Sequence, residues 1–290
     1  MHSRFAAFYF FLISFTPLSF ATTSFSISVE EFVEASQSQK VILIDARPQK
    51  FYKEGHIENA ISLPFTQTFT QFGKTGRVIG IPEAQKLFSN AGIQPDVLVV
   101  AYDNHPASLM ASRVLWTLLT YGHQNIKLLD GGLNAAERAG IELTQVEHKI
   151  TPSNFVPSFN PQTYASRKTA IEASSNLQDF ALIDAREIEH YQGEKSQAKR
   201  FGHIPNSINI DFRLNMQTDG TLKSRAELQT LYQDIPKDKQ VVIYCHMGDA
   251  SALEYFILRE LGYQVASYDA SWQEWGNDFS LPIIKPASEK

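Results

Sequence analysis

The sequence predicts an α/β fold with two tandem domains, each a parallel sheet flanked by helices. The first observation is an internal duplication, because the segment LIDAR occurs at 43–47 and again at 182–186. The second is that the predicted strands are continuous apolar runs without alternating polarity, which is typical of strands buried on both faces. The third is that these strands alternate with helical segments, as the crossovers of a parallel sheet require.

The duplication extends through each half of the chain in the same order. The corresponding pairs are the strands 41–47 and 180–186, the Gly-His-Ile tripeptides 55–57 and 202–204, the apolar segments 60–65 and 207–212, and the strands 97–103 and 240–245. An amphipathic helix then ends near Gly122 or Gly262, and one more apolar strand stops at Asp130 or Asp269. Two copies of so long a unit indicate two domains and not a solenoid.

Length and composition agree with two globular domains. The chain has 290 residues, of which 43% are apolar and 20% charged, enough for two hydrophobic cores. Its net charge is −5, from 26 basic and 31 acidic residues, which argues against nucleic acid or an anionic membrane surface as the main partner. We predict domains over 25–143 and 163–282, joined over 144–162 by an extended, proline-containing linker.

The N-terminal segment has the pattern of a secretory signal peptide. Arg4 precedes an almost wholly apolar run from Phe5 to Phe20, and small residues then end at Ala21. We expect a signal peptide over 1–21 that is cleaved after Ala21, and a periplasmic or secreted mature protein without stable membrane association. The alternative is a membrane anchor, but the apolar run is shorter than the ~20 residues that a spanning helix needs.

Cys245, the only cysteine of the chain, follows a buried strand and precedes a helix. The strand is 241–244, and the helix is predicted over 251–261. A side chain at such a corner lies over the N-terminus of the helix, among backbone N–H groups without intrahelical partners. We therefore expect a solvent-open thiol that loses its proton readily and acts as a nucleophile. The alternative is a packed core thiol.

The order of these motifs resembles the two-domain rhodaneses, which are thiosulfate and mercaptopyruvate sulfurtransferases. The resemblance covers about residues 25–280 and includes the Tyr-Cys pair at 244–245, Gly248 and the segment YDASWQEW at 268–275. It implies two tandem rhodanese-like domains, each a parallel five-stranded sheet flanked by helices, with an inactive first domain and a catalytic second one. Asp103 stands where Cys245 stands in the second domain, and a carboxylate cannot carry a sulfane sulfur.

The resemblance implies a double displacement at Cys245. The thiolate attacks the outer sulfur of a donor such as thiosulfate, sulfite leaves, and a thiophilic acceptor (cyanide or a thiol) takes the sulfur from the persulfide. The expected partners are therefore these small molecules, and the protein is expected to be a monomer. The resemblance implies no cofactor and no metal.

Candidate substrate-binding residues surround this cysteine in the expected fold. Arg186 matches the family's substrate-binding arginine and Arg200 is a second candidate, since each guanidinium could hold an anionic oxygen. The alternative for Arg186 is a structural ion pair, because Arg47 has the same position in the first domain. Loop amides would cradle the thiolate and the persulfide. The loop candidates are His246, Met247, Gly248, Asp249, Ala250 and Ser251.

The loop composition leaves the sulfur donor open. A protonated His246 would favour the thiolate and attract anions, whereas an inward-facing Asp249 would oppose both effects. We favour thiosulfate, because two arginines and His246 suit a dianion; 3-mercaptopyruvate is the alternative donor. Asp45, Asp184, His56 and His203 are expected to be structural, and Trp272 and Trp275 to line the pocket or the core.

Two other functions use a similar arrangement. A phosphatase of related fold needs an arginine at the sixth position after its cysteine, and Ser251 stands there, so phosphoryl transfer lacks its electrostatic stabiliser. The second alternative is a non-catalytic persulfide carrier or redox sensor, which also needs a lone reactive thiol. This alternative stays open.

Overall fold

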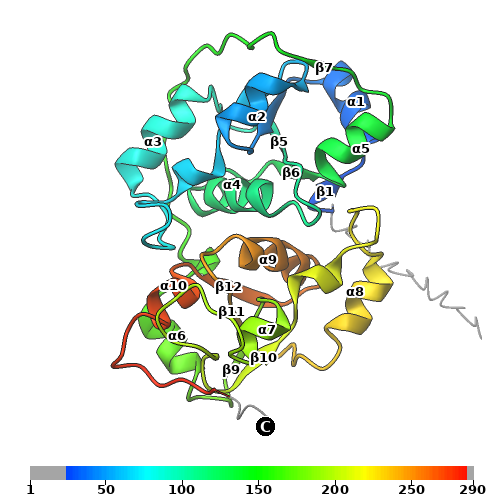
Figure 1. The fold of residues 1–290 in the computed structure, drawn as a ribbon. Coiled ribbons are helices and arrows are strands. Elements are labelled where there is room, and N and C mark those ends of the chain that lie inside the picture. Colours follow the sequence, from blue (N-terminus) through cyan, green and yellow to red (C-terminus); the bar gives the residue numbers. More distant parts are fainter. Residues whose placement is uncertain (1–23, 286–290) are drawn as a thin grey trace, which may run out of the picture.

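The computed structural model describes residues 24–285, which form two α/β domains, one above the other in Figure 1. The predicted signal peptide, 1–21, lies outside the described residues. Within 24–285, no helix combines the length and the apolar character that a membrane crossing requires.

The first domain contains a five-stranded parallel sheet in the order β1-β6-β5-β2-β4. Its strands are β1 (Ser26–Ile27), β2 (Val41–Asp45), β4 (Ile61–Ser62), β5 (Leu98–Tyr102) and β6 (Ile126–Leu129). Its helices are α1 (Val29–Ser38), α2 (Gln49–Glu54), α3 (Ile81–Asn90), α4 (Leu109–Thr120), α5 (Gly132–Arg138) and the 3₁₀ helix η1 (Phe65–Thr68). A short antiparallel pair, β3 (His56–Ile57) with β7 (Leu143–Thr144), closes the domain.

The second domain repeats this topology with the order β10-β9-β11-β12-β8. Its strands are β8 (Tyr164–Ala165), β9 (Phe180–Asp184), β10 (Ser207–Asn209), β11 (Gln240–Tyr244) and β12 (Gln264–Tyr268). Its helices are α6 (Arg167–Ala173), α7 (Ile188–Tyr191), α8 (Arg225–Leu231), α9 (Ala250–Glu260), α10 (Ser271–Trp275) and the 3₁₀ helices η2 (Pro161–Thr163) and η3 (Phe212–Asn215). Two parallel five-stranded sheets flanked by helices were predicted, and the structure confirms this fold class.

The central strands show why apolar runs form these sheets. Every residue of β5 is buried, and in β11 only Gln240 is partly exposed, because each strand has neighbours on both sides and helices on both faces. An alternating sequence would bury polar side chains here at a cost of several kcal/mol.

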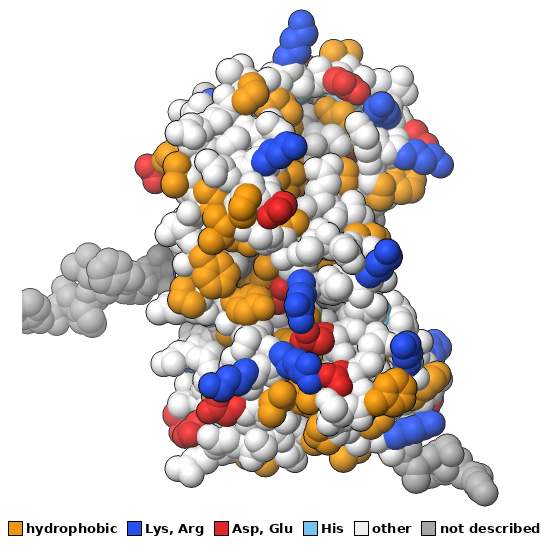
Figure 2. Space-filling model, turned by 90° about the vertical axis from the view of Figure 1, so that its left-hand side faces the viewer, with side chains coloured by type: hydrophobic (Ala, Val, Ile, Leu, Met, Phe, Trp, Pro, Cys, Tyr) orange, Lys and Arg blue, Asp and Glu red, His pale blue; other side chains and the backbone are white. Residues whose placement is uncertain are grey.

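Helices α4 and α9 lie between the two sheets and form the interface between the domains (Figure 1). Only Met110 of α4 is not buried, which explains why eight of the twelve residues of this helix are apolar. One hydrophobic cluster extends from Val99 on β5, through Val114 and Leu253 on the two helices, to Val241 on β11. Hydrophobic side chains also gather toward the domain junction on the face shown in Figure 2.

The aspartates that directly follow β6 and β12, Asp130 and Asp269, join the domains reciprocally. The Leu222 amide of the second domain donates to Asp130 Oδ1 at 2.9 Å. The Val78 amide of the first domain donates to Asp269 Oδ2 at 2.6 Å. The duplication seen in the sequence is therefore also a duplication of the contacts that hold the domains together.

The Gly-His-Ile histidines are structural, as expected. His56 Nδ1 lies 2.7 Å from the Tyr52 carbonyl oxygen, and the two rings stack at 3.7 Å. His203 Nδ1 lies 2.8 Å from the Tyr191 carbonyl oxygen, with the same stacking distance. Each histidine thus fixes the turn between a helix and the strand that follows.

The segment between the domains has no helix or strand from 145 to 160 and runs over the outside of the first domain (Figure 1). It is nevertheless anchored. The Val146 carbonyl oxygen lies 3.2 Å from His56 Nε2, and Phe155 packs edge-on against Phe88 with ring centroids 5.2 Å apart.

Candidate active site

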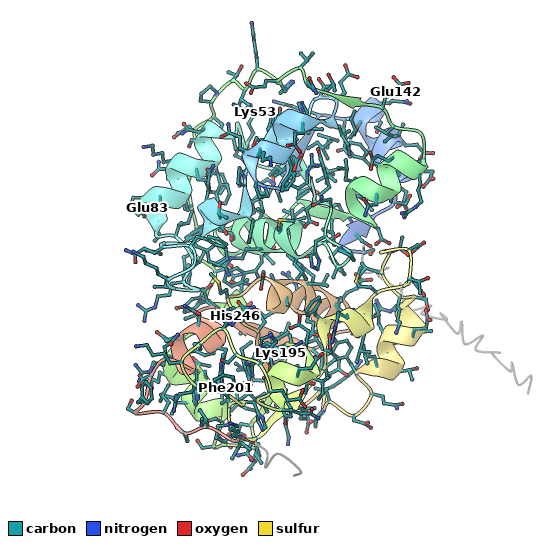
Figure 3. The ribbon with its side chains drawn as sticks, viewed as in Figure 1. Lys53, Glu83, Glu142, Lys195, Phe201 and His246 are labelled. Atoms are coloured by element: carbon teal, nitrogen blue, oxygen red, sulfur yellow. The ribbon has the colours of Figure 1, made fainter. Side chains whose placement is uncertain are left out.

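The Cys245 loop lies at the carboxyl end of β11, where ligands of open parallel sheets bind. Asp249 caps α9, with its side chain accepting the Ala250 amide at 2.9 Å. The N-terminus of α10 holds the other end of the loop, since the Trp272 amide donates to the Cys245 carbonyl at 3.0 Å and the Gln273 amide to the His246 carbonyl at 2.9 Å. Figure 3 shows His246 at the edge of the second domain that faces the first.

Of the loop amides from 246 to 251 that were expected to cradle the sulfur, two favour its thiolate. The Gly248 N–H donates to Cys245 Sγ at 3.0 Å, and the Ser251 amide and hydroxyl also favour the thiolate. Gly248 has φ 95°, a left-handed conformation that glycine adopts without strain. The loop therefore forms an anion cradle around the sulfur.

The prediction of a solvent-open, readily ionised thiol is wrong. Cys245 is 1% exposed, and burial raises the pKa of its thiol to about 11, with Asp249 adding to the rise. The Asp249 side chain faces inward, and Cys245 Sγ donates to its Oδ1 at 3.3 Å. The amides stabilise a thiolate, but desolvation and the adjacent carboxylate outweigh them.

In the first domain the corresponding loop holds the carboxylate of Asp103. This side chain is fully buried and accepts the amides of His105 at 2.6 Å and Ala111 at 2.7 Å. Burial raises its pKa to about 6. Backbone amides of this loop and of α4 thus hold a side chain that cannot bind sulfur covalently, in agreement with a first domain that lacks the nucleophile.

Arg186 forms the ion pair that was its structural alternative. Its Nη2 lies 2.6 Å from Asp184 Oδ2 and donates to the Gly202 carbonyl at 2.8 Å, while the guanidinium lies 4.5 Å from the Trp272 ring centroid. Arg47 repeats the geometry in the first domain, with Asp45. Arg186 Nη1 is the nitrogen without a hydrogen-bond partner among the described residues.

Arg200 was expected to bind substrate, and the structure directs its guanidinium elsewhere. Its three nitrogens donate to four backbone carbonyls of the C-terminal segment, among them Leu281 at 2.7 Å and Trp275 at 2.6 Å. These bonds use its donors to hold the chain after α10. The prediction for Arg200 is wrong because these carbonyls lie about 75 to 81 positions further along the chain, where sequence proximity gives no signal.

The remaining loop residues divide by exposure. His246, Met247 and Asp249 are partly exposed, whereas Gly248 and Ala250 are buried. Burial lowers the pKa of His246 to about 4, so this imidazole is neutral at pH 7, and the suggestion that its charge attracts anions is wrong. Ser251 is buried and its hydroxyl lies 3.0 Å from Ser267 Oγ. Trp272 and Trp275 are fully buried core residues.

Two residues near the loop were missed. The hydroxyl of Ser271 accepts the Cys245 amide at 3.2 Å. Arg113, on α4 of the first domain, donates to the Gly248 carbonyl at 3.3 Å. The available signal for Arg113 was a single charged residue within a mostly apolar helix; its partner could not be read from the sequence.

This constellation is that of a rhodanese, and the chain belongs to the rhodanese family. A family model described as "Rhodanese-like domain" matches residues 28–139 and 169–278. The chain is 29% identical over 276 residues to a candidate thiosulfate sulfurtransferase of Haloferax volcanii, covering 89% of this chain and 92% of that protein. It is 32% identical over 249 residues to the sulfur carrier protein TtuD of Thermus thermophilus, with coverages of 81% and 87%.

Solved structures show the same fold. An EanB variant in complex with ergothioneine has a TM-score of 0.83 at 20% identity, covering 91% of this chain and 71% of that one. An anaerobic ergothioneine biosynthesis enzyme from Chlorobium limicola has a TM-score of 0.81 at 20% identity, with coverages of 91% and 70%. The relatives named as sulfurtransferases support sulfurtransferase activity for this chain.

Proposed function

We propose that this protein moves the sulfane sulfur of thiosulfate to a thiophilic acceptor through a persulfide on Cys245. The observation that carries the proposal is the 3.0 Å hydrogen bond from the Gly248 amide to Cys245 Sγ, in a loop between β11 and the N-terminus of α9. Such a cradle stabilises the anionic sulfur before and after transfer. The names of the relatives favour thiosulfate as the donor.

The reaction has two displacements at sulfur. The thiol proton passes to Asp249, whose Oδ1 lies 3.3 Å from Cys245 Sγ. The thiolate then attacks the outer sulfur of thiosulfate, the sulfur–sulfur bond breaks, and sulfite leaves with the bonding electrons. A cyanide or thiolate acceptor attacks the terminal sulfur of the persulfide, and Cys245 leaves as the thiolate that the amides stabilise.

Donor entry requires a change at the loop, because Cys245 is 1% exposed. The partly exposed side chains of His246, Met247 and Asp249 are those whose displacement opens a path. Arg186 Nη1, buried and without a partner among the described residues, is the donor that we assign to an anionic oxygen of the substrate. The carboxylate of 3-mercaptopyruvate would use the same nitrogen, so this donor is the alternative.

Replacement of the nucleophile tests the proposal. We expect the wild-type protein to form thiocyanate and sulfite from thiosulfate and cyanide, and to gain one sulfur atom in its intact mass after donor treatment. Cys245→Ser is expected to abolish both while retaining the wild-type unfolding temperature. Wild-type turnover by the serine variant would refute Cys245 as the nucleophile. Faster turnover of 3-mercaptopyruvate than of thiosulfate would identify 3-mercaptopyruvate as the sulfur donor.

A sulfur carrier is the second candidate. The relative named as a sulfur carrier, at 32% identity, and the buried thiol favour it, because a shielded persulfide is protected from solvent. In that case the protein gains sulfur stoichiometrically from a donor and passes it to a protein thiol much faster than to cyanide. Single-turnover unloading of the persulfide to the two acceptors separates the candidates.

We also propose that the protein is exported, on the basis of the N-terminal sequence pattern. N-terminal sequencing of the mature protein is expected to begin at Thr22. An intact Met1 in the mature protein would contradict export by cleavage.

A further inference from the structure

Arg113 reaches from the first domain into the catalytic loop of the second. It lies on α4, is completely buried, and its Nη1 donates to Asp269 Oδ1 at 2.9 Å and to the Gly248 carbonyl at 3.3 Å. Its other nitrogens face Thr68 Oγ1 and the Gly76 carbonyl, and its guanidinium lies 4.2 Å from the Phe69 ring centroid. The side chain is therefore held on all sides in one position.

Gly248, which accepts a hydrogen bond from Arg113, is also the residue that donates to the sulfur of Cys245. Gly248 accepts the Arg113 hydrogen bond through its carbonyl and donates its N–H to Cys245 Sγ at 3.0 Å. The fit is close, since a Cβ on Gly248 would lie 2.6 Å from Arg113 Nη1 and 2.9 Å from the Asp269 carbonyl oxygen. A movement of the guanidinium thus moves the amide that faces the sulfur.

The contacts that join the two domains do not by themselves require an arginine at position 113. Asp130 and Asp269 are corresponding residues, and each accepts a backbone amide from the opposite domain. Only Asp269 has an arginine as well, since none of the ion pairs found over residues 24–285 involves Asp130. The additional cation comes from the first domain and contacts Gly248 of the loop that carries Cys245.

We propose that Arg113 is a positioning residue of the active site, by which the first domain holds Gly248 with its amide directed at the sulfur of Cys245. This inference rests on the proposed sulfur transfer at Cys245. It gives the first domain, which lacks a nucleophile, a defined part in the chemistry. A guanidinium is required because its three nitrogens serve separate partners in one plane: Nη1 donates to Asp269 and Gly248, Nε to Thr68 and Nη2 to Gly76.

The test compares three variants. Arg113→Lys keeps the charge opposite Asp269 but loses the fork. Arg113→Met combined with Asp269→Asn removes the pair without leaving a buried charge, and the Asn oxygen still accepts the Val78 amide. The matched control is Arg77→Met, because Arg77 also forms an ion pair across the interface, with Glu274, but has 61% of its side chain exposed.

For each variant we would measure the unfolding temperature, kcat and KM for thiosulfate, and the pH dependence of Cys245 alkylation by iodoacetamide. We expect both Arg113 variants to lose roughly tenfold or more in kcat, with KM within about twofold, because a displaced cradle weakens the transition state more than the ground state. Alkylation at pH 7 should become about fivefold slower, because the displaced Gly248 amide no longer stabilises the reactive thiolate. Arg77→Met should change none of these.

Wild-type kcat and alkylation profiles in both Arg113 variants would overturn the inference, as would equal effects in Arg77→Met. If Arg113→Lys does not fold, the test depends on the double variant, Arg113→Met with Asp269→Asn, which leaves no unpaired charge. A wild-type protein without sulfur transfer would refute the proposed function alone, since the alkylation profiles still show whether Arg113 holds the loop.

Discussion

At the level of single residues, the protonation of Cys245 is decided by opposing effects on one sulfur atom. Two amides and a hydroxyl favour the thiolate, whereas burial and Asp249 disfavour it, and the pKa of about 11 shows that the second pair prevails. The free enzyme therefore holds a thiol at pH 7. This form resists adventitious alkylation and oxidation, because the thiolate is the reactive species.

Asp249→Asn separates two effects of this carboxylate: it raises the pKa of Cys245, and it is the proposed acceptor of the thiol proton. Removal of the adjacent charge is expected to lower the pKa of Cys245 and to speed alkylation at pH 7 by about tenfold, since one pKa unit changes the thiolate fraction by that factor. Turnover should fall, because the proton acceptor is lost. Asn still caps α9, so the fold is expected to persist. The exposed Asp238 provides the control variant Asp238→Asn, and slower alkylation of Asp249→Asn would contradict the assignment.

Gly248→Ala tests the closeness of packing under the sulfur. The added Cβ would meet Arg113 and the Asp269 backbone at less than 3 Å, whereas Gly262, with a similar φ of 88°, has nothing within 4 Å. Both alanine variants incur the cost of a left-handed conformation, about 1 kcal/mol. Only Gly248→Ala is expected to lose sulfurtransferase activity and further stability in denaturant unfolding. Equal effects of the two substitutions would show that the space around Gly248 is not critical.

At the level of elements, the strand–loop–helix unit of each domain directs backbone amides at the side chain of its corner residue, although the amides differ in position between the domains. In the first domain the cradle before α4 holds the Asp103 carboxylate, and in the second the cradle before α9 holds the Cys245 thiol. The repeated element thus supplies anion stabilisation, and one side chain at its corner determines whether covalent chemistry follows.

Asp103 is expected to give the protein a distinct pH dependence of stability. Its folded pKa of about 6 lies above the usual value of 3.8, so the folded state binds the proton more tightly. Stability from this group is fully present below pH 3.8 and is lost as the pH rises through 6. Relative to Asp103→Asn, the wild-type free energy of unfolding should gain roughly 2.4 kcal/mol between pH 8 and pH 4.

Denaturant titrations of both proteins at several pH values measure this difference. Thiosulfate turnover is expected to be almost unchanged in the Asn variant, because Asp103 does not contact the Cys245 loop. A constant stability difference over this pH range would show that Asp103 ionises normally in the folded protein.

At the level of the whole molecule, the two domains share one core. The cluster between the sheets continues across α4 and α9, and the aromatic rings of Phe25 and Phe256 stack between domains with centroids 5.4 Å apart. Separate clusters lie on the outer faces of the two sheets. Because the shared cluster belongs to both domains, neither can unfold without exposing apolar surface of the other.

Phe256→Ala tests this cooperativity. We expect a loss of about 3–5 kcal/mol in the free energy of unfolding, with both domains still unfolding in one transition. The control is Phe279→Ala, since Phe279 is 71% exposed. Tryptophan fluorescence reports on both domains through Trp116 and Trp272. Two resolved transitions in the wild-type protein would contradict a common core.

The sequence by itself determined the duplication, the parallel sheets and the placement of Cys245 at a strand–helix corner, with Asp103 at the corresponding position. Apolar periodicity and order along the chain carry this information within short segments. The tertiary structure decided the ionisation of Cys245, the contacts of Arg186 with the Gly202 carbonyl and Trp272, and the use of Arg200 by backbone carbonyls. Burial and partners depend on residues distant in the chain, as for Arg113 and Gly248, which are 135 positions apart.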